Sequence, residues 1–417
     1  MSVKKGYRQT EVGLIPDEWE VDFLERFWSV TDCKHITAKF TADGYPIVSI
    51  KEVQNRFVDL VNANRTSARF FNLLAEGTRR PRSGDLILSR NATVGEIAQV
   101  ADWHPPFAMG QDVCLLRKRS PKYSSAFLQS LFKSPIISRQ LSDLMVGSTF
   151  KRANVQQIKH LQVAMPNPAE QEAIAGALSD ADAWIESLEQ LLAKKRQIKQ
   201  GAMQELLAGK RRLPGFSREW ETKRLGELFE ITSSKRVFQS DWKSEGIPFY
   251  RARELAVLGE WGRVDNELFI PRSLYDAFKA AHGIPEAGDM LVTGVGTLGK
   301  VYVVTGDHDF YFKDGNIIWF KIRGSISPEF LRQLYLTKVV LKQITDASAG
   351  TTVGTYTISG AKETEIPFPS LSEQTAIATI LSDMDAEINS MESKLAKARQ
   401  IKQGMMQELL TGRIRLV

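Results

Sequence analysis

Cysteine is scarce in this chain, since Cys33 and Cys114 are the only two among 417 residues. Two isolated thiols supply neither a zinc site of the Cys-x-x-Cys type nor a disulfide framework, and this usage is typical of a reducing cytoplasm. The N-terminal residues lack the apolar segment of a signal peptide, and no apolar run approaches the ~20 residues that cross a bilayer. We therefore expect a cytoplasmic protein with no membrane partner.

Recognisable catalytic motifs are also lacking. The five histidines, at positions 35, 104, 160, 282 and 308, are not spaced as metal ligands, and there is no Gly-x-Ser-x-Gly segment. The segment His104–Phe107 resembles the catalytic loop of amino-methyltransferases, but histidine stands where the acceptor of the target amine belongs. No glycine-rich loop for S-adenosylmethionine accompanies it, and a proline-rich loop is the better interpretation. The chain is predicted to have no catalytic residues, no metal site and no cofactor of its own.

One glycine-rich segment resembles a phosphate-binding loop. Gly294, Gly296 and Gly299 fit a Gly-x-Gly-x-x-Gly pattern, and Lys300 follows. Such loops need a helix N-terminus after them to receive the phosphate. The residues that follow, Val301–Val304, are β-branched and aromatic and are typical of a strand. A β-hairpin turn is therefore predicted, and an enzyme with a nucleotide site here is the alternative.

Charge of neither sign dominates, although lysine and arginine outnumber acidic residues enough for a formal charge of +6 and a pI near 9.1. A basic balance permits a polyanionic partner without requiring one. Hydrophobic residues make up 43% of the chain, which is ordinary for a globular protein. At this length two or three domains are expected.

The chain contains a duplication. Residues 170–213 recur at 373–416 with a shift of 203 positions and no gaps, and about 30 of the 44 positions are identical. The rest of each half repeats faintly: residues 46–53 match 248–255, and residues 84–95 match 288–299. A period near 200 residues indicates a duplicated domain rather than a solenoid. The expected order is globular unit, helix, globular unit, helix.

Each strongly repeated segment is predicted to be a long helix. Asn167 and Pro168 begin the first as N-cap and first helical residue, and Ser370 with Glu373 forms a capping box before the second. A narrow apolar seam repeats every seven residues over nearly five heptads, which favours a two-helix coiled coil. Lysines at the C-terminal ends suggest that the seam drifts there. The seam residues are Ile174, Leu178, Ile185, Leu188, Leu192 and Leu206 in the first helix and Ile377, Leu381, Ile388, Leu395 and Leu409 in the second.

Connectivity predicts the direction of the two helices. The second globular unit joins the end of the first helix to the start of the second, and a parallel pair would require that link to travel back ~50 Å. Antiparallel helices place those two ends side by side. The prediction is a pseudo-two-fold molecule with globular units at residues 1–166 and 214–369 and helical segments at 167–213 and 370–417. A helix packed only against its own globular unit is the alternative.

Both globular units are predicted to be α+β. The expected strands are Asp85–Ser89, Ile97–Val100, Val113–Arg117, Asp289–Thr293 and Val301–Thr305, and the expected helices are Tyr123–Phe132 and Pro328–Ile344.

Loop residues with groups suited to DNA are candidates for binding, because Arg, Asn and Gln contact base edges while Lys, Ser and Thr more often hold phosphate. The clusters Gly147–Arg152 and Gly350–Tyr356 stand at equivalent places before the long helices. The candidates are Lys51, Arg90, Asn91, Thr93, Gln111, Ser148, Thr149, Lys151 and Arg152 in the first unit and Arg251, Arg253, Thr293, Thr297, Lys313, Asn316, Thr351, Thr352 and Tyr356 in the second.

These features in their doubled order resemble the specificity subunit of type I restriction–modification systems. The resemblance covers the whole chain and is carried by Pro16–Glu20 and Arg218–Glu221, by the Gly-Asp turns at 84 and 288, and by the paired ends of the long helices. One departure is that Arg90-Asn91 in the first turn becomes Gly294-Val295 in the second. Contacts to individual bases are therefore not carried over.

The resemblance implies a role that spacing alone does not show. Each globular unit would be a target recognition domain that reads one half of a bipartite site in double-stranded DNA. The helices would form the spacer and help dock two methyltransferase subunits, which motor-nuclease subunits join. S-adenosylmethionine, ATP and magnesium would be used by those partners, and this chain would be non-catalytic. The alternatives are a specificity subunit of a type IIB-like system and a coiled-coil scaffold that binds only protein.

Overall fold

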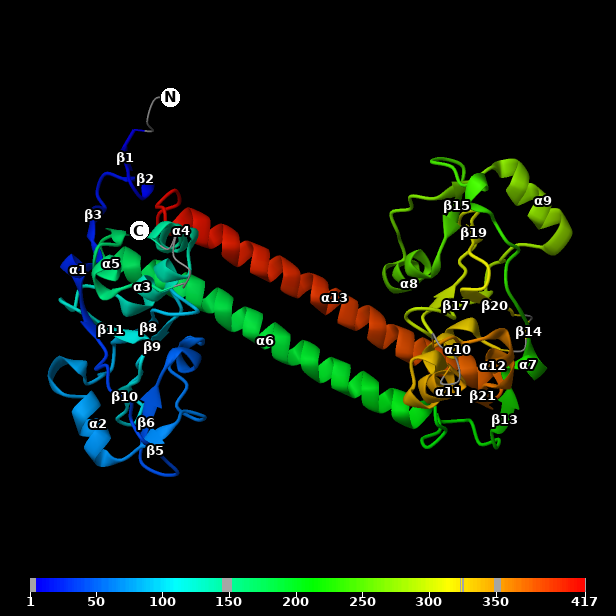
Figure 1. Cartoon of the computed structure of the whole chain (residues 1–417), viewed down its shortest axis with the longest axis horizontal. Coiled ribbons are helices and arrows are strands. Elements are labelled where there is room, and N and C mark those ends of the chain that lie inside the picture. Colours follow the sequence, from blue (N-terminus) through cyan, green and yellow to red (C-terminus); the bar gives the residue numbers. More distant parts are fainter. Residues whose placement is uncertain (1–4, 145–151, 323, 325, 349–353, 417) are drawn as a thin grey trace. The chain divides into compact units, whose positions relative to one another are not determined.

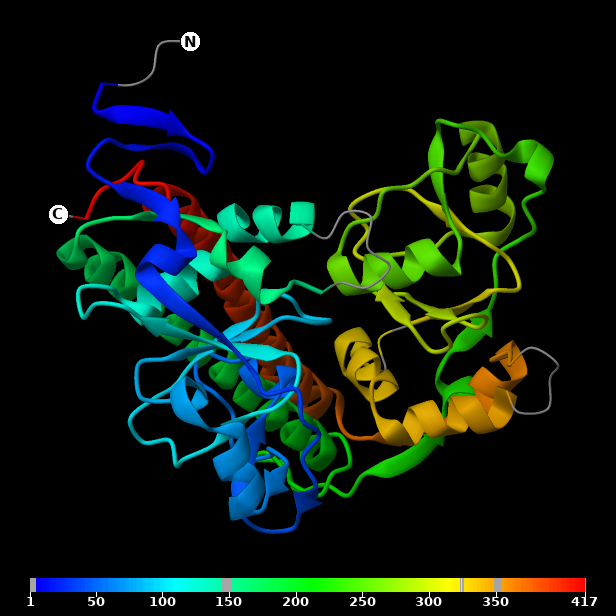
Figure 2. The same ribbon diagram turned by 60° about the vertical axis from the view of Figure 1, so that its left-hand side comes forward.

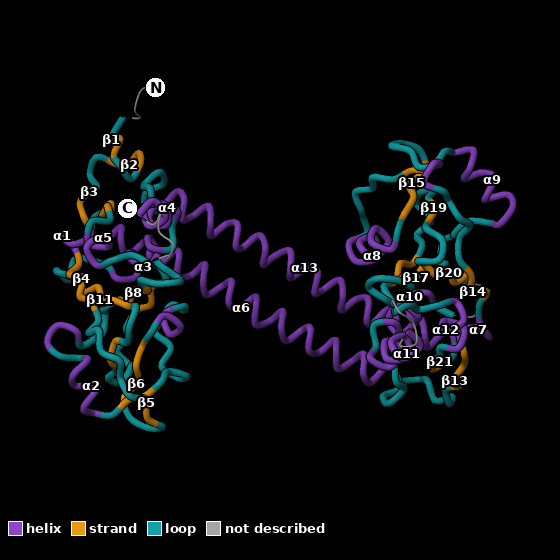
Figure 3. Tube along the Cα trace, in the orientation of Figure 1, coloured by secondary structure: helices purple, strands orange, loops and turns teal. Residues whose placement is uncertain are grey.

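The computed structural model describes residues 5–144, 152–322, 324, 326–348 and 354–416. The chain divides into two compact units: unit 1 comprises residues 1–189 with 394–417, and unit 2 comprises residues 190–393. Two long helices, α6 (Pro168–Leu206) and α13 (Leu371–Leu409), contribute to both units. Figure 1 follows the chain by colour and Figure 3 by element type.

Unit 1 mixes short strands with short helices, as predicted. Its strands are β1 (Tyr7–Thr10), β2 (Gly13–Pro16), β3 (Glu20–Phe23), β4 (Trp28–Asp32), β5 (Phe40–Thr41), β6 (Tyr45–Val48), β7 (Arg65–Thr66), β8 (Leu86–Ser89), β9 (Ile97–Gln99), β10 (Ala108–Met109), β11 (Val113–Lys118) and β12 (Gln162–Met165). Its short helices are α1 (Leu24–Phe27), η1 (Ile50–Val53), α2 (Ala68–Leu74), η2 (Gly77–Arg79), α3 (Ser125–Phe132), α4 (Pro135–Leu144) and α5 (Val155–Lys159).

Unit 2 has the same mixture of short strands and helices, although two of its helices, α8 and α9, are longer than η1 and α2 in the corresponding stretch of unit 1. Its strands are β13 (Glu221–Arg224), β14 (Glu230–Thr232), β15 (Ile247–Tyr250), β16 (Phe269–Ile270), β17 (Met290–Thr293), β18 (Val301–Val303), β19 (Tyr311–Phe312), β20 (Ile317–Lys321) and β21 (Glu365–Phe368). Its short helices are α7 (Leu225–Leu228), η3 (Gln239–Asp241), α8 (Ala252–Trp261), α9 (Arg272–His282), α10 (Pro328–Tyr335), α11 (Lys338–Ser348) and α12 (Ile358–Glu363).

The same antiparallel sheet lies at the centre of each unit. The strand order is β4-β11-β8-β9 in unit 1 and β14-β20-β17-β18 in unit 2. A parallel pair accompanies each sheet, β6 with β10 and β15 with β19. A two-stranded sheet, β3 with β12 and β13 with β21, precedes each long helix. These three strand arrangements are therefore duplicated even where the sequences match only faintly, although the hairpin β1-β2 and the longer sheet β10-β6-β7-β5 have no full counterpart among the described residues of unit 2.

Apolar residues on both faces explain why the central strands read as continuous hydrophobic runs. In β8, Leu86 and Leu88 pack into the core beneath α3, whereas Ile87 packs into a second core on the other face. In β17, Met290 and Val292 face the core beneath α10, and Leu291 faces the opposite core. Each central sheet is thus sandwiched between two hydrophobic clusters.

The helix predicted at Pro328–Ile344 is wrong in one respect, because the structure has two helices there. The chain leaves α10 at Leu336, and α11 begins after Thr337, whose hydroxyl accepts a hydrogen bond from the Val340 amide at 3.4 Å. Unit 1 breaks at the equivalent place, between α3 and α4, where Ser134 precedes Pro135. The break in unit 2 contains no proline or glycine, so the sequence of that half, taken alone, predicts one continuous helix.

The two long helices confirm the predicted pair and begin where their capping residues indicate. The Asn167 side chain accepts from the Glu170 amide at 2.9 Å, and Ser370 Oγ accepts from the Glu373 amide at 3.4 Å. The carboxylate of Glu373 bonds to Trp220 and Arg212. The predicted capping box at this helix is therefore only half formed: the serine caps the helix, but the glutamate side chain is used by Trp220 and Arg212 instead of the Ser370 amide.

Ion pairs across the helices show that they run antiparallel within each unit. In unit 2, Lys195 meets Glu387 at 2.5 Å and Lys199 meets Asp385. In unit 1, Arg399 meets Glu189 at 2.5 Å and Lys402 meets Asp182. In each unit the residue numbers of the pairs rise along one helix and fall along the other, which is the antiparallel arrangement that the connectivity predicts.

The predicted apolar seam is largely buried. Its residues Ile185 and Leu188 are partly exposed, and the buried ones are Ile174, Leu178, Leu192, Leu206, Ile377, Leu381, Ile388, Leu395 and Leu409. The outer seam residues join the cores of the globular parts, for example Leu178 in unit 1 and Leu381 in unit 2. Each helix therefore packs both on its partner helix and on a globular core.

A buried charged contact repeats in the two units. In unit 1 the Glu170 carboxylate accepts from Trp19 Nε1 at 3.1 Å and from Arg415 Nε at 2.5 Å. In unit 2 the Glu373 carboxylate accepts from Trp220 Nε1 at 3.0 Å and, at 2.8 Å, from the guanidinium of Arg212. In each unit the arginine follows the end of one long helix and the glutamate begins the other.

The two ends of the chain lie together in unit 1. The Tyr7 hydroxyl donates to the Gly412 carbonyl at 2.9 Å, and Figures 1 and 2 both show the N-terminal hairpin beside the C-terminal end of α13. A search of the described helices for a membrane-spanning segment found none with the required length and apolar character.

Candidate nucleic-acid interface

Two hydrogen bonds join three loop segments at one edge of each central sheet. In unit 1 the Arg90 amide donates to the Asp112 carbonyl at 2.8 Å, and the Ala153 amide donates to the Arg90 carbonyl at 2.9 Å. In unit 2 the Gly294 amide donates to the Asn316 carbonyl at 2.8 Å, and the Tyr356 amide donates to the Gly294 carbonyl at 2.9 Å. The same backbone frame therefore carries different side chains in the two units.

A fourth segment, the loop after the first sheet strand, is tied to this frame in both units. In unit 1, Gln111 Nε2 donates to Thr37 Oγ1 at 3.1 Å. In unit 2, Arg236 Nε donates to Asp314 Oδ2 at 3.1 Å. We call these segments the loop cluster: residues 33–39, 90–95, 110–112 and 152–154 in unit 1, and 233–238, 294–299, 313–316 and 354–356 in unit 2.

The hairpin turns of the loop cluster are held by hydroxyl groups. Ser89 Oγ donates to the Asn91 carbonyl at 3.1 Å and lies 3.2 Å from Thr93 Oγ1. Thr293 Oγ1 accepts from the Lys300 amide at 3.0 Å and donates to the Thr297 carbonyl. Because β18 follows the second turn, no helix N-terminus is available to bind phosphate, and the predicted hairpin is confirmed. The nucleotide-site alternative loses its structural basis.

Ten of the candidate DNA-binding residues have exposed or partly exposed side chains. Seven of them belong to the loop cluster, and three lie on the neighbouring segments η1 and α8. The seven are Asn91, Thr93, Gln111, Arg152, Thr297, Lys313 and Asn316, and the three are Lys51, Arg251 and Arg253. Their binding to DNA stays a prediction.

Three candidates are buried, which corrects the expectation that they are surface groups. Arg90 is 2% exposed and its guanidinium lies 2.6 Å from the Asp32 carboxylate. Thr293 is 1% exposed and is used within its own turn. Tyr356 is 1% exposed, and its hydroxyl pairs with those of Tyr335 at 3.2 Å and Thr364 at 2.8 Å. Each supports the loop cluster from beneath rather than offering a side chain to a ligand.

Five further candidates lie outside the described residues: Ser148, Thr149, Lys151, Thr351 and Thr352. The chain on either side of both segments is described, and the hydrogen bonds of Ala153 and Tyr356 attach those flanking residues to the loop cluster.

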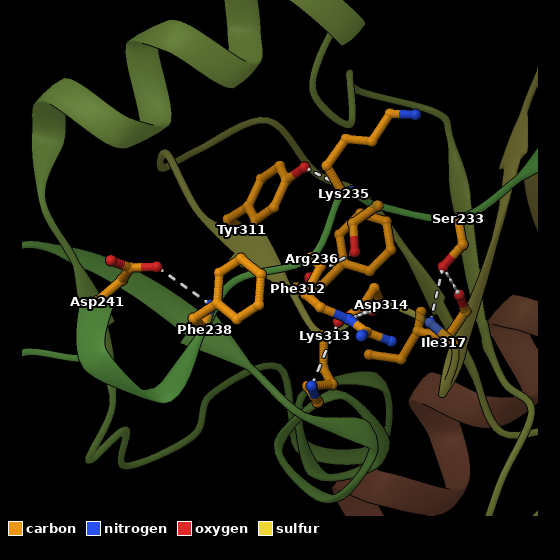
Figure 4. Close-up of polar contacts among 12 residues, drawn as sticks. Ser233, Lys235, Arg236, Phe238, Asp241, Tyr311, Phe312, Lys313, Asp314 and Ile317 are labelled. Atoms are coloured by element: carbon orange, nitrogen blue, oxygen red, sulfur yellow. Dashed lines mark hydrogen bonds and ion pairs between the residues drawn. The ribbon is translucent and has the colours of Figure 1, made fainter.

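Two exposed cations of unit 2 were missed by the sequence analysis. Lys235 and Arg236 follow β14, and Figure 4 shows Arg236 and Lys313 reaching the Asp314 carboxylate, the second at 3.2 Å. The same figure shows the loop pinned by Ser233 Oγ, which donates to the Ile317 carbonyl at 2.8 Å. The available signal was a basic pair separated by two residues from the end of a strand, and it lies outside the repeated segments.

The side chains of Asp32, Cys33 and His35 bring three potential metal ligands within 4.8 Å of one another. The Arg90 guanidinium already lies against Asp32 and reaches to 3.8 Å from the Cys33 sulfur. Burial raises the pKa of the Cys33 thiol, with the negative charge of Asp32 acting in the same direction. A fixed cation and a protonated thiol do not fit a divalent metal. Asp32 and the buried Cys33 are therefore best described as a support for Arg90 at the β8–β9 turn, with His35 exposed beside them.

Comparison with known proteins gives one family. The model of the type I restriction modification DNA specificity domain matches residues 16–200 and again residues 217–400. The MjaX specificity subunit of a type I restriction enzyme from Methanocaldococcus jannaschii is 25% identical over 437 residues, which covers 99% of this chain and 97% of that protein. The MjaIX specificity subunit of the same organism is 21% identical, covering 98% and 96%.

Solved structures agree at the level of the fold. The S subunit of a type I restriction-modification system from M. genitalium has a TM-score of 0.59 at 17% identity and covers 98% of both chains. The HsdS subunit from Thermoanaerobacter tengcongensis has a TM-score of 0.52 at 17% identity, covering 96% of this chain and 98% of that one.

Proposed function

We propose that this chain, which belongs to the family of type I restriction–modification DNA specificity subunits, reads a split DNA site with one loop cluster for each half. The supporting observation is that one backbone frame is built twice and carries different side chains. Asp112 in unit 1 corresponds to Asn316 in unit 2, and Ala153 corresponds to Tyr356. A common frame with changed side chains suits two domains that bind the same polymer and recognise different bases.

Electrostatics supports contact with the DNA backbone. The loop cluster of unit 2 presents Lys235, Arg236 and Lys313, and that of unit 1 presents Arg152, whose nearest carboxylate, Asp112, is 3.8 Å away. Cations of this kind contribute sequence-independent affinity for phosphate, while Asn, Gln and Arg are suited to base edges. The net charge of +6 acts in the same direction.

The partners in this proposal are two methyltransferase subunits, which motor-nuclease subunits join, and this chain is non-catalytic. A solved relative with a TM-score of 0.56 is described in a study of complex assembly and conformational transition of the type I system. S-adenosylmethionine, ATP and magnesium would be bound by the partner subunits. The exposed faces of α6 and α13 are suited to docking, since the inner faces are occupied by the helix pair.

The test is to co-express the chain with its methyltransferase partner and sequence the genomic DNA for methylated positions. The expected result is one bipartite motif, methylated only when this chain is present. Methylation without a motif, or a motif that persists without the chain, would contradict the proposal.

A salt titration separates this proposal from a scaffold that binds only protein. The methylase complex should bind its own duplex with a steep salt dependence, and Lys235→Ala with Arg236→Ala should reduce the slope of log K against log salt by about one to two. The matched control is Lys342→Ala, an exposed lysine of α11 in the same unit. Equal slopes in the two variants would exclude these residues from the interface.

A further inference from the structure

Unit 1 contains a cavity beside its loop cluster. The cavity measures about 240 Å³ and lies between the loop of residues 36–40, the strand β6 and residues 110–112. Its walls include the apolar side chains of Ile36, Phe40, Ile47 and Leu74. Ile47 and Leu74 are buried, whereas Phe40 is 63% exposed. The floor is therefore part of the hydrophobic core, and the wall formed by Phe40 faces solvent.

Polar groups also line the same cavity. Gln111, Asp112 and Asn64 line it, together with Thr37, which accepts the hydrogen bond from Gln111. The Asn64 side chain makes no hydrogen bond to the residues that the structure describes, although its backbone carbonyl accepts from the Ile47 amide at 2.7 Å. A mainly apolar slot with a few hydrogen-bonding groups in its lining is the arrangement that holds a flat heteroaromatic ring.

We propose that this cavity takes one nucleobase unstacked from the DNA site, an inference that rests on the DNA-reading function proposed above. An apolar cavity of about 150 Å³ is large enough for a benzene ring, so about 240 Å³ accommodates a base. Proteins that hold an extruded base stack it between aromatic or apolar side chains and bond to its pairing edge. Phe40 and Ile36 supply the stacking surfaces here, and the polar groups supply the bonds.

The polar groups of the cavity favour a base with an exocyclic amino group. A carboxylate such as that of Asp112 only accepts hydrogen bonds, and a glutamine amide both donates and accepts. An acceptor paired with a mixed group matches adenine and cytosine alike, because each offers an amino donor beside a ring-nitrogen acceptor, while guanine offers its amino donor beside a ring N–H donor. Thymine has no exocyclic amino group and does not match Asp112.

The backbone at residues 110–112 holds Gln111 and Asp112 in place. The Gly110 amide donates to the Val48 carbonyl at 2.7 Å, and a Cβ at Gly110 would lie 2.9 Å from Ile47 Cγ2 and 3.2 Å from the Val48 oxygen. Glycine therefore lets the chain pass close to β6. Asp112 then turns with a φ of +65°, and its carbonyl receives the Arg90 amide at 2.8 Å. The cavity lining and the turn of the loop cluster are thus parts of one rigid arrangement.

Unit 2 uses the corresponding segments differently. It also exposes one phenylalanine on the loop after its first sheet strand, Phe238, which is 62% exposed. There, however, Arg236 and Lys313 both meet Asp314. Asn316 stands where unit 1 has Asp112, so the acceptor-only carboxylate is lost from that place. The proposal therefore concerns the half-site read by unit 1 alone.

The experiment measures the affinity of the methylase complex for duplexes of its own site, each with one base left unpaired by an abasic residue opposite. Removing the partner base lowers the cost of extrusion, so a protein that holds the extruded base binds that duplex more tightly. The expected result is a gain of about tenfold at one position of one half-site, in addition to any gain at the methylated bases that the methyltransferase itself extrudes. Phe40→Ala and the cavity-filling Ala38→Phe should abolish the gain. The control Trp103→Ala, which removes an exposed aromatic side chain of the same unit outside the loop cluster, should leave the gain unchanged.

The outcomes separate this inference from the function on which it rests. A complex that fails to bind its intact site with a steep salt dependence contradicts the DNA-reading function. A complex that binds normally but gains nothing at any position contradicts only the cavity inference. A gain that persists in both cavity variants belongs to the methyltransferase, which must itself extrude its target base, and also overturns the inference. Because Phe40 is largely exposed, Phe40→Ala tests the cavity even if Ala38→Phe disturbs folding.

Discussion

The glutamates at the start of the long helices each bind side chains that lie far away in the sequence. Glu170 and Glu373 are fully buried, and each accepts from a tryptophan and an arginine that come from distant parts of the chain. The next residue contributes in the same way in both units. Gln171 accepts from the Ser124 amide at 2.9 Å and Gln374 accepts from the Ser327 amide at 2.9 Å. The repeated Glu-Gln pair therefore attaches each long helix to its globular part.

Glu373→Ala should selectively destabilise unit 2. The substitution leaves the Trp220 indole and the Arg212 guanidinium without their shared acceptor, and the loss of charged hydrogen bonds at a buried site costs about 2–3 kcal/mol. Hydrogen exchange followed by mass spectrometry should show faster exchange in unit 2 than in unit 1. The control is Glu245→Ala, an exposed glutamate of the same unit. Similar exchange in the two variants would refute the role of Glu373.

For single residues, the sequence predicts which chemical groups a loop carries better than it predicts whether those groups are exposed. Arg90, Thr293 and Tyr356 carry groups suited to DNA, and their segments do reach the loop cluster. Their burial depends on Asp32, Thr297 and Tyr335, which lie elsewhere in the sequence or on the far side of a turn. Sequence patterns report which groups a loop contains, whereas tertiary packing decides which of them face solvent.

At the scale of elements, lysines in the apolar seam have a specific partner. The sequence pattern suggested that the seam drifts near the ends of the helices. The structure shows instead that the side chain of Lys402, 20% exposed, pairs with Asp182, and that of Lys199, 14% exposed, pairs with Asp385. Charged pairs inside a narrow seam disfavour other registers, because a shift would leave a buried lysine unpaired. Each lysine has its partner on the other long helix, far away in the sequence, so the heptad pattern of one helix cannot predict the pair.

Lys402→Glu should weaken the helix pair by about 1–2 kcal/mol, because it places a carboxylate against Asp182. The charge-swapped double variant with Asp182→Lys should recover much of the loss, and a double-mutant cycle from thermal unfolding measures the coupling. Lys397→Glu, an exposed position of the same helix, is the control. A swap that recovers nothing would show that the pair does not stabilise this register.

The break between α10 and α11 shows where a pattern within one half fails and the duplication helps. Ser134-Pro135 in unit 1 corresponds to Thr337-Lys338 in unit 2 at the shift of 203 positions. The proline in the first copy indicates a helix start that the second copy conceals. Comparing the two halves residue by residue would have predicted two helices in unit 2.

At the scale of the whole molecule, the duplication predicts the architecture and leaves recognition open. The long helices, their direction and the equivalence of the two units follow from the repeat and from connectivity. The cations of the 233–238 loop and the cavity of unit 1 do not, since both lie in segments where the halves diverge. Comparing the two halves predicts nothing for segments in which they differ, and these are the segments proposed to recognise DNA.

The long helices are predicted to set the gap between the two half-sites. Four residues inserted after Glu189 in α6 and after Ser393 in α13 lengthen each helix by about 6 Å, which corresponds to one to two base pairs at about 3.4 Å each. These insertions leave the ion pairs within each unit intact. Sequencing of methylated positions should show unchanged half-sites and a longer gap. The control, Lys194→Ala on the exposed face of α6, should leave the gap unchanged, and an unchanged gap in the lengthened variant would refute the spacer role.

The central claim is that two modules read independently, and an exchange of one module tests it most directly. Residues 215–366 would be replaced by the second unit of another member of the family, and the chain would be co-expressed with its methyltransferase partner. Sequencing of methylated genomic DNA should then show one new half-site beside one unchanged half-site. The reciprocal exchange of the first unit should change the other half. A change in both half-sites after a single exchange would contradict the account.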